Sequence, residues 1–291
     1  MRSPALRVAL VVALTAVGAA CHKRAPTKAP PSADAGALED AGADSADGDA
    51  GAQADDDTPS PSSEPDVDPA TDTSPLMIQR VPFGPYLSGI GGRATPRMAY
   101  VVRAKQSQRA PRLLANLHGV CNPPEYACGY WSRAAATWGT LVCPEGNSRC
   151  GTDGPSTWTQ STAKTDEDLE RAIVAAGALR TERDILTGFS LGAYAAAEIA
   201  RRHPGRWAYL ILTEADVPLD AAKLRAAGVR AVAMVAGELG TQIHGERRTV
   251  AQLTAQKFPA KLFVMKKAGH HYSADVDDVM AEALAFVTSV K

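Results

Sequence analysis

The segment "RDILTGFSLGAYAAAEIARRHP", residues 183–204, contains a short apolar run and an alanine-rich stretch, with a serine flanked by two glycines between them. The apolar run predicts a buried β-strand, and the alanine-rich stretch predicts a helix. Residues 188–192 at the junction read G-x-S-x-G. Glycines suit a sharp, strained strand-to-helix turn, which lifts the serine hydroxyl to the carboxyl edge of a sheet. The pattern therefore indicates Ser190 as a nucleophile.

Outward from this segment, short apolar runs alternate with helical patterns. Near-continuous apolar runs are typical of strands that are buried on both faces. The alternation predicts a single α/β domain over residues 76–291, with a mostly parallel sheet and helices on both faces. We expect the first two runs to form a hairpin. The runs lie at residues 98–103, 113–117, 140–143, 184–189, 208–213, 231–236 and 261–265.

The N-terminal residues 1–20 have the pattern of a secretory signal peptide. A charged start is followed by about ten apolar residues, too few for a bilayer-spanning helix, and then by small residues. Cys21 comes directly afterwards, which resembles a bacterial lipoprotein signal. That resemblance implies an exported protein that is held on a membrane of the cell envelope through lipidated Cys21. The alternative is cleavage after Ala20, which would leave a soluble periplasmic or secreted protein.

Residues 21–75 read as a disordered acidic linker, rich in Ala, Asp and Pro. Within it, residues 34–72 hold 13 Asp or Glu and no Lys or Arg. Residues 73–291 hold 26 Lys or Arg and 19 Asp or Glu, a net charge of +7. The whole chain carries a net charge of −1, and this balance argues against a nucleic-acid partner.

Two further motifs stand at the ends of expected strands. His118 and Gly119 close the second apolar run, and "AGHHY", residues 268–272, follows the last run. Parallel strands bring their carboxyl ends to one edge of a sheet, so both motifs are expected beside Ser190. A histidine there can act as a general base toward a serine and then as an acid toward the leaving group.

These motifs together resemble the α/β-hydrolase family, over essentially all of residues 76–291. The form without an inserted cap domain is most similar to secreted polyhydroxybutyrate depolymerases and feruloyl-type esterases. The resemblance implies His270 as the base, with His271 as the alternative because the doublet leaves the register open. It also implies an oxyanion hole built from the backbone N–H groups of Val120 and Leu191. His118 is not expected to be the base, since family bases follow the last strand.

The acidic member of the triad departs from the family pattern. The family usually has an aspartate three residues after a glycine that ends the strand expected at 231–236, and that position here is Gly240. Glu238 is our preferred acid. Glu214 and Asp216, after the preceding strand, are the alternatives, and a triad without an acid is the remaining possibility. An acid fixes the histidine tautomer and stabilises the imidazolium.

Four cysteines fall in the expected domain. An even set in an exported protein reads as disulfides, and the lack of C-x-x-C spacing argues against zinc. All three connectivities are open, and we favour the two local pairs, Cys121 with Cys128 and Cys143 with Cys150. We expect these bridges to stiffen the loop that carries Val120.

The sequence thus predicts an exported, membrane-anchored serine hydrolase that cleaves carboxylic esters through an acyl-serine intermediate. We expect a small-molecule or polymer ester as substrate, and neither a metal nor an organic cofactor. One alternative is a catalytically inactive surface protein that binds a ligand with the same fold. A peptidase or thioesterase on this fold is the other.

Overall fold

The structure is a computed structural model that describes residues 76–85, 96–105, 112–151 and 154–291. All of these residues belong to one compact unit, Glu64–Lys291. The expected signal peptide, Cys21 and the acidic linker lie outside the described residues.

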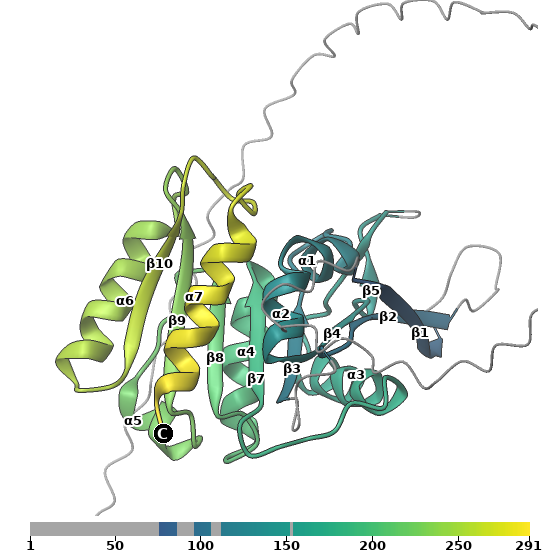
Figure 1. The fold of residues 1–291 in the computed structure, drawn as a ribbon, viewed down its shortest axis with the longest axis horizontal. Helices are drawn as coiled ribbons and strands as arrows, with labels where there is room; N and C mark the ends of the chain where they lie inside the picture. Colours follow the sequence, from purple (N-terminus) through teal and green to yellow (C-terminus); the bar gives the residue numbers. More distant parts are fainter. Residues whose placement is uncertain (1–75, 86–95, 106–111, 152–153) are drawn as a thin grey trace, which may run out of the picture. The chain divides into compact units, whose positions relative to one another are not determined.

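The core of the unit is an eight-stranded sheet with the order β1-β2-β4-β3-β7-β8-β9-β10 (Figure 1). The six strands from β4 to β10 pair in parallel, whereas β2 pairs antiparallel with both β1 and β4. A separate two-stranded ribbon joins β5 to β6. The strands are β1 (Ile78–Pro85), β2 (Pro96–Val102), β3 (Arg112–Leu117), β4 (Gly139–Pro144), β5 (Ser148–Arg149), β6 (Ser156–Thr157), β7 (Ile185–Phe189), β8 (Tyr209–Thr213), β9 (Ala231–Gly237) and β10 (Ala260–Met265).

Each of the seven apolar runs forms a strand, which confirms the mostly parallel α/β sheet. Every residue of β7, β8 and β9 is buried, as a sheet covered on both faces requires. The expected hairpin is wrong: β2 pairs with β1, and β3 lies between β4 and β7. Sequence patterning missed β1, "IQRVPFGP", because its prolines argue against a strand. Proline is tolerated there because β1 is an edge strand.

Helices cover both faces of the sheet. On one face α3 (Thr162–Ala175), α4 (Leu191–Arg202), α5 (Ala221–Ala226) and α6 (Ile243–Ala255) contribute buried residues to one apolar cluster. On the other face α1 (Pro124–Tyr130), α2 (Ser132–Trp138) and α7 (Val276–Ser289) contribute to a second cluster. Figure 1 shows α7 crossing this second face. The two clusters make the sheet the middle of three layers.

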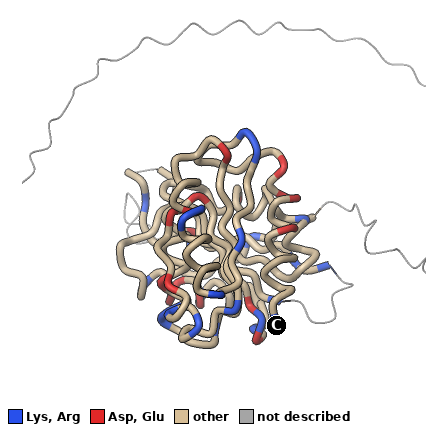
Figure 2. Tube along the Cα trace, turned by 90° about the vertical axis from the view of Figure 1, so that its left-hand side faces the viewer, with Lys and Arg blue, Asp and Glu red and all other residues tan. Residues whose placement is uncertain are grey.

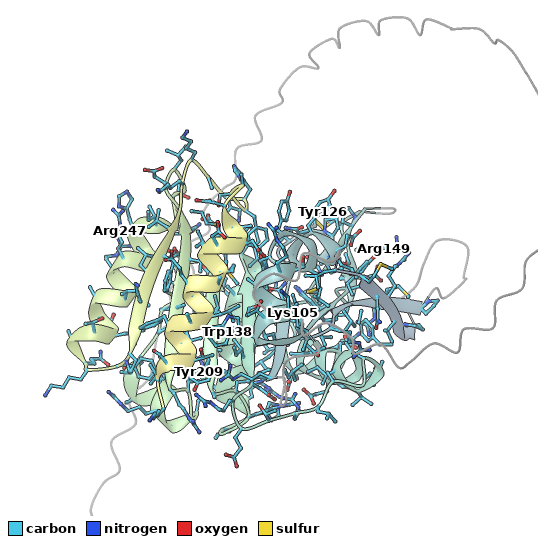
Figure 3. The ribbon with its side chains drawn as sticks, viewed as in Figure 1. Lys105, Tyr126, Trp138, Arg149, Tyr209 and Arg247 are labelled. Atoms are coloured by element: carbon cyan, nitrogen blue, oxygen red, sulfur yellow. A yellow bond between two sulfur atoms is a disulfide. The ribbon has the colours of Figure 1, made fainter. Side chains whose placement is uncertain are left out.

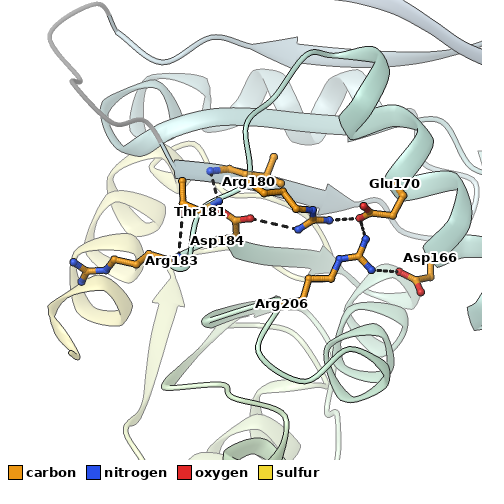
Figure 4. Close-up of polar contacts among 8 residues, drawn as sticks. Asp166, Glu170, Arg180, Thr181, Arg183, Asp184 and Arg206 are labelled. Carbon is orange, nitrogen blue, oxygen red and sulfur yellow. Dashed lines mark hydrogen bonds and ion pairs between the residues drawn. The ribbon is translucent and has the colours of Figure 1, made fainter.

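A polar network ties α3 to the amino end of β7 (Figure 4). Arg180 contacts Glu170 of α3 and also Asp184, whose Oδ2 lies 3.4 Å from Nη1 of the guanidinium. Arg206 contacts the same Glu170, and its Nη1 lies 3.5 Å from Oδ1 of Asp166. Since Ser190 follows the carboxyl end of β7, these charges stand at the far end of the strand from Ser190.

Charge is mixed over the described residues. Figure 2 shows Lys and Arg positions interspersed with Asp and Glu positions along the trace. Within the described part of the chain, no helix is long and apolar enough to cross a bilayer.

Candidate active site

Ser190 occupies a strained turn between β7 and α4. Its φ is 52° and its ψ is −119°, a positive φ that residues with a Cβ seldom adopt. The backbone closes so tightly that a Cβ at Gly188 would lie 2.3 Å from the carbonyl oxygen of Gly192. A Cβ at Gly192 would lie 1.9 Å from that of Leu117. Only glycine fits at either position, and the turn presents the Ser190 hydroxyl at the carboxyl edge of the sheet.

His270 is the histidine that reaches Ser190. Its Nε2 lies 2.9 Å from Oγ of Ser190, and its side chain is half exposed. The next residue, His271, turns to the backbone instead: its Nε2 accepts from the N–H of Gly269, and its Nδ1 lies 3.0 Å from the carbonyl oxygen of Tyr272. The structure thus places His270, and not His271, in reach of the serine hydroxyl.

Glu214 completes a chain of three side chains. Its Oε2 lies 3.1 Å from Nδ1 of His270, and its Oε1 accepts from the N–H of Gly237. The carboxylate is fully buried, and this burial raises the pKa of Glu214, while the bonds from Gly237 and His270 lower it. With Nδ1–H donating to Glu214, Nε2 of His270 is left to accept from Ser190.

Our preference for Glu238 as the partner of His270 is wrong. Oε2 of Glu238 accepts from the backbone N–H of Lys267 at 3.0 Å, on the exposed side of the loop. Asp216 accepts from the hydroxyl of Tyr194. Of the three candidate carboxylates, only Glu214 contacts the imidazole.

Gly240 lies beside the carboxylate of Glu214, the acid that follows β8. A Cβ at this position would lie 3.0 Å from Oε2 of Glu214. The carboxylate of Glu214 therefore fills the space beside the position where the family pattern expects an aspartate. Glycine at 240 leaves the room that Glu214 needs.

The loop after β3 runs beside the nucleophile. A Cβ at Gly119 would lie 3.3 Å from Cβ of Ser190. Leu191 is the first residue of α4, where backbone N–H groups point out of the helix without an intrahelical partner. Val120, the next residue of the loop, is exposed. Leu191 thus follows Ser190 directly, and the loop that carries Val120 passes beside Ser190 at Gly119.

His118 is buried under this loop, and both of its ring nitrogens bond groups other than Ser190. Its Nε2 accepts from the N–H of Gly146 at 3.0 Å, so Nδ1 carries the hydrogen and donates to the carbonyl oxygen of Gly119 at 2.8 Å. Burial lowers the pKa of His118 to about 4, which keeps the ring neutral. In a trans peptide the N–H points opposite to the C=O, so this bond also sets the direction of the Val120 N–H.

The four cysteines form two disulfides, as expected, but the pairing differs from the two local loops. Cys121 bonds Cys150, with Cα atoms 5.5 Å apart, and Cys128 bonds Cys143, with Cα atoms 6.1 Å apart. The first bridge holds the end of the oxyanion loop, and the second holds α1 against β4. The local pairing is wrong because Cys121 lies beside the segment that carries Cys150, whereas Cys128 of α1 lies beside Cys143 of β4.

One buried acid of this region was missed. Glu246 lies in the first turn of α6, and its Oε1 accepts from the N–H of Ala215, beside Glu214, at 2.7 Å. Burial is the main cause that raises the pKa of Glu246 to about 8; the charges of Glu214 and Asp216 act in the same direction, and the bond from Ala215 acts against them. Acidic residues are common and usually exposed in a first helical turn, so no sequence signal marked this one.

The described residues hold no cluster of three or more His, Cys, Asp or Glu side chains that could bind a metal ion.

Comparison with known proteins identifies the fold. No protein-family model matches the sequence, and no curated protein matches it. Among solved structures, the chain is similar to the fluorophosphonate-binding serine hydrolase FphF of Staphylococcus aureus. The identity is 13%, 73% of this chain and 98% of that chain are covered, and the TM-score is 0.51. It is also similar to the esterase LipW of Mycobacterium marinum, with 12% identity, 73% and 82% coverage and a TM-score of 0.50. The chain thus has the α/β-hydrolase fold.

Proposed function

We propose that this protein is a serine hydrolase that cleaves carboxylic esters through an acyl-serine intermediate. The observation that carries the proposal is the continuous hydrogen-bonded chain from Ser190 Oγ to His270 Nε2 at 2.9 Å, and from His270 Nδ1 to Glu214 Oε2 at 3.1 Å. A nucleophile within reach of a base that a third group orients is the arrangement that activates a hydroxyl.

In acylation, Oγ of Ser190 attacks the ester carbonyl carbon, and its proton passes to Nε2 of His270. The carbonyl oxygen becomes an oxyanion, which accepts hydrogen bonds from the N–H groups of Val120 and Leu191. The tetrahedral intermediate collapses when the bond to the alkoxide oxygen breaks. His270 gives its proton to that oxygen, and the alcohol leaves.

In deacylation, a water molecule takes the place of the alcohol. His270 accepts a proton from the water as its oxygen attacks the acyl carbon, and then returns a proton to Oγ of Ser190 as the acid leaves. Glu214 keeps the imidazole in one tautomer and offsets its positive charge in both steps. LipW is described as an esterase and FphF as a fluorophosphonate-binding serine hydrolase with substrate bound, which supports an ester as the substrate here.

A fluorophosphonate probe tests the proposal on the purified protein, because it reacts with activated serines. We expect labelling that is lost in Ser190→Ala and slowed by roughly 10³-fold or more in His270→Ala. Matched controls are Ser289→Ala and His244→Ala, which change residues in α7 and in the exposed surface of α6. Both should label like the wild type.

Absence of labelling in the folded, disulfide-bonded protein would overturn the proposal. The fold would then be a candidate scaffold for ligand binding alone. If the serine is labelled and the protein hydrolyses peptides or thioesters but none of a panel of acyl esters, it is a peptidase or thioesterase instead.

We also propose that the protein is exported and anchored through lipidated Cys21. The signal-like residues 1–20 support this, and so do the two disulfides, which are typical of oxidising compartments. Metabolic labelling with a fatty acid in a bacterial host tests it. Incorporation should disappear in Cys21→Ser, and a label-free wild type in the soluble periplasmic fraction would contradict anchoring.

A further inference from the structure

A cavity of about 230 Å³ opens beside His270. It is smaller than the roughly 300–1,000 Å³ of pockets that enclose a whole drug-sized ligand, so it has room for one part of a substrate. Most of its lining is aromatic. The rings are those of Tyr126, Tyr130, Phe189 and Tyr272, with Asn122 and the two histidines His270 and His271 completing the wall. We call Tyr126, Tyr130, Tyr272 and Phe189 the aromatic shelf.

The rings of the shelf form an unbroken series that ends at the base. Ring centroids of Tyr126 and Tyr130 are 6.2 Å apart, and those of Tyr130 and Tyr272 are 5.5 Å apart. The series continues from Tyr272 to Phe189 at 4.9 Å and from Phe189 to His270 at 5.2 Å. All four pairs lie within the range of ring–ring attraction. The surface available to a ligand is therefore aromatic from the rim to the catalytic imidazole.

The outer two rings are left open. Tyr126 is 55% exposed and Tyr130 is 52% exposed, although both carry a large aromatic ring. Figure 3 shows Tyr126 at the top of the right-hand half of the described residues. A ligand ring that covered Tyr126 and Tyr130 would gain ring–ring contacts, which are favourable beyond the area that they bury.

The disulfides hold the shelf in place before a ligand arrives. Tyr126 and Tyr130 lie on α1, and Cys128 between them is bonded to Cys143 of β4. Cys121, just before the helix, is bonded to Cys150. A short helix pinned at both of these points loses little conformational freedom on binding, so the rings are preorganised.

Chemistry assigns the shelf to one side of the substrate. In the proposed reaction His270 delivers a proton to the leaving oxygen, so the group attached to that oxygen must lie on the His270 side of the scissile bond. His270 itself lines the cavity. In the proposed reaction the N–H groups of Val120 and Leu191 hold the carbonyl oxygen, and neither residue lines the cavity.

We propose that the aromatic shelf binds the alcohol portion of the ester, and that the protein's substrates are esters of alcohols that carry an aromatic ring. This inference rests on the proposed serine hydrolase activity. The ring of the alcohol stacks on Tyr126 and Tyr130, while Phe189 and Tyr272 face its inner edge. No new covalent step is involved: the alcohol leaves with the proton from His270.

The test compares kcat/KM for benzyl acetate and cyclohexylmethyl acetate with the purified full-length protein. Both release a primary alkoxide of similar size, so they differ mainly in aromaticity. We expect benzyl acetate to be the better substrate by about 5-fold, the scale of a ring–ring contact. The preference should fall to about 1 in Tyr126→Leu/Tyr130→Leu and persist in Tyr126→Phe/Tyr130→Phe.

Tyr194→Leu is the matched control, because Tyr194 is an exposed tyrosine of α4 that does not line the cavity. It should keep the benzyl preference. Methyl phenylacetate and methyl cyclohexylacetate provide the acyl-side comparison, and there we expect no aromatic preference.

Three outcomes are distinguishable. Hydrolysis of both acetates at equal rates, with Ser190 labelled by the fluorophosphonate, would overturn the shelf proposal and leave the proposed function standing. An aromatic preference confined to the acyl-side pair would overturn the alcohol-side assignment. If neither hydrolysis nor labelling is observed, the proposed function is overturned, and the shelf proposal falls with it.

Discussion

The carboxylate of Glu214 lies 3.1 Å from Nδ1 of His270, although 56 positions separate the two residues in the chain. Glu214 follows β8 with a φ of 54°, and its second oxygen accepts from Gly237 at the end of β9. Two neighbouring strands therefore hold the carboxylate on the imidazole. The bond selects the tautomer of His270 whose Nε2 faces Ser190.

Replacing Glu214 by glutamine should lower kcat/KM for an acetate ester by roughly 10³- to 10⁴-fold, because an amide neither fixes this tautomer nor offsets the imidazolium charge. Glu238→Gln is the matched comparison. Its carboxylate bonds only the N–H of Lys267 among the contacts described, so its rate should stay within about 2-fold of the wild type. Equal losses in both variants would contradict the assignment of Glu214.

Glu246 should make stability fall as pH rises. Burial raises the pKa of Glu246 to about 8 from its ordinary 4.5, so between these values the folded protein holds a proton that the unfolded chain releases. The free energy of unfolding should therefore decrease from pH 5 to pH 8.5, with this group contributing of the order of 2–4 kcal/mol. Glu246→Gln should remove that contribution.

Urea unfolding at the two pH values measures the effect as the difference between wild type and variant, which cancels the other titrating groups. Glu282→Gln, at an exposed position of α7, is the control and should follow the wild type. A parallel pH dependence in wild type and Glu246→Gln would show that Glu246 is ionised in the folded protein.

The two disulfides should contribute separately to stability. In the chain-entropy account, bridges with sequence separations of 29 and 15 each stabilise by about 3–4 kcal/mol, the longer loop slightly more. The paired variants Cys121→Ser/Cys150→Ser and Cys128→Ser/Cys143→Ser should lose about these amounts in urea unfolding. Peptide mapping without reduction should recover the same two pairs, and a Cys121–Cys128 peptide would contradict the pairing.

His118 should act on the reaction by positioning the Val120 peptide. His118→Phe removes the donor to the carbonyl oxygen of Gly119, and we expect kcat to fall by roughly 10-fold or more with little change in KM. His118→Asn retains an N–H donor near the position of Nδ1, so it should recover part of the rate. Equal rates in the two variants, with both folded by circular dichroism, would show that this bond does not control the oxyanion loop.

Much of the fold follows from local patterning. The seven apolar runs form strands, and this is clearest for β7, β8 and β9, where every residue is buried and continuous apolar side chains are needed. The turn at Ser190 was recognised from its local G-x-S-x-G pattern, although only Gly188 is required by contacts within the turn, whereas Gly192 is required by the close approach of Leu117 in β3. By contrast, strand β1 was not predicted, because Pro82 argues against a strand unless the strand lies at the edge of the sheet, as β1 does.

The partners of the site were decided by the tertiary structure. Sequence placed Glu214, Asp216 and Glu238 near one edge of the sheet, but the choice among them depended on which side chain points at His270 and on the space beside Gly240. The disulfide pairing likewise depended on distances between segments that are far apart in the chain. Sequence alone determined the strands and the nucleophile turn, because steric and burial requirements act on neighbouring residues. The carboxylate, the histidine register and the cysteine pairs are contacts between distant segments, which only the packed chain brings within hydrogen-bonding or bonding distance.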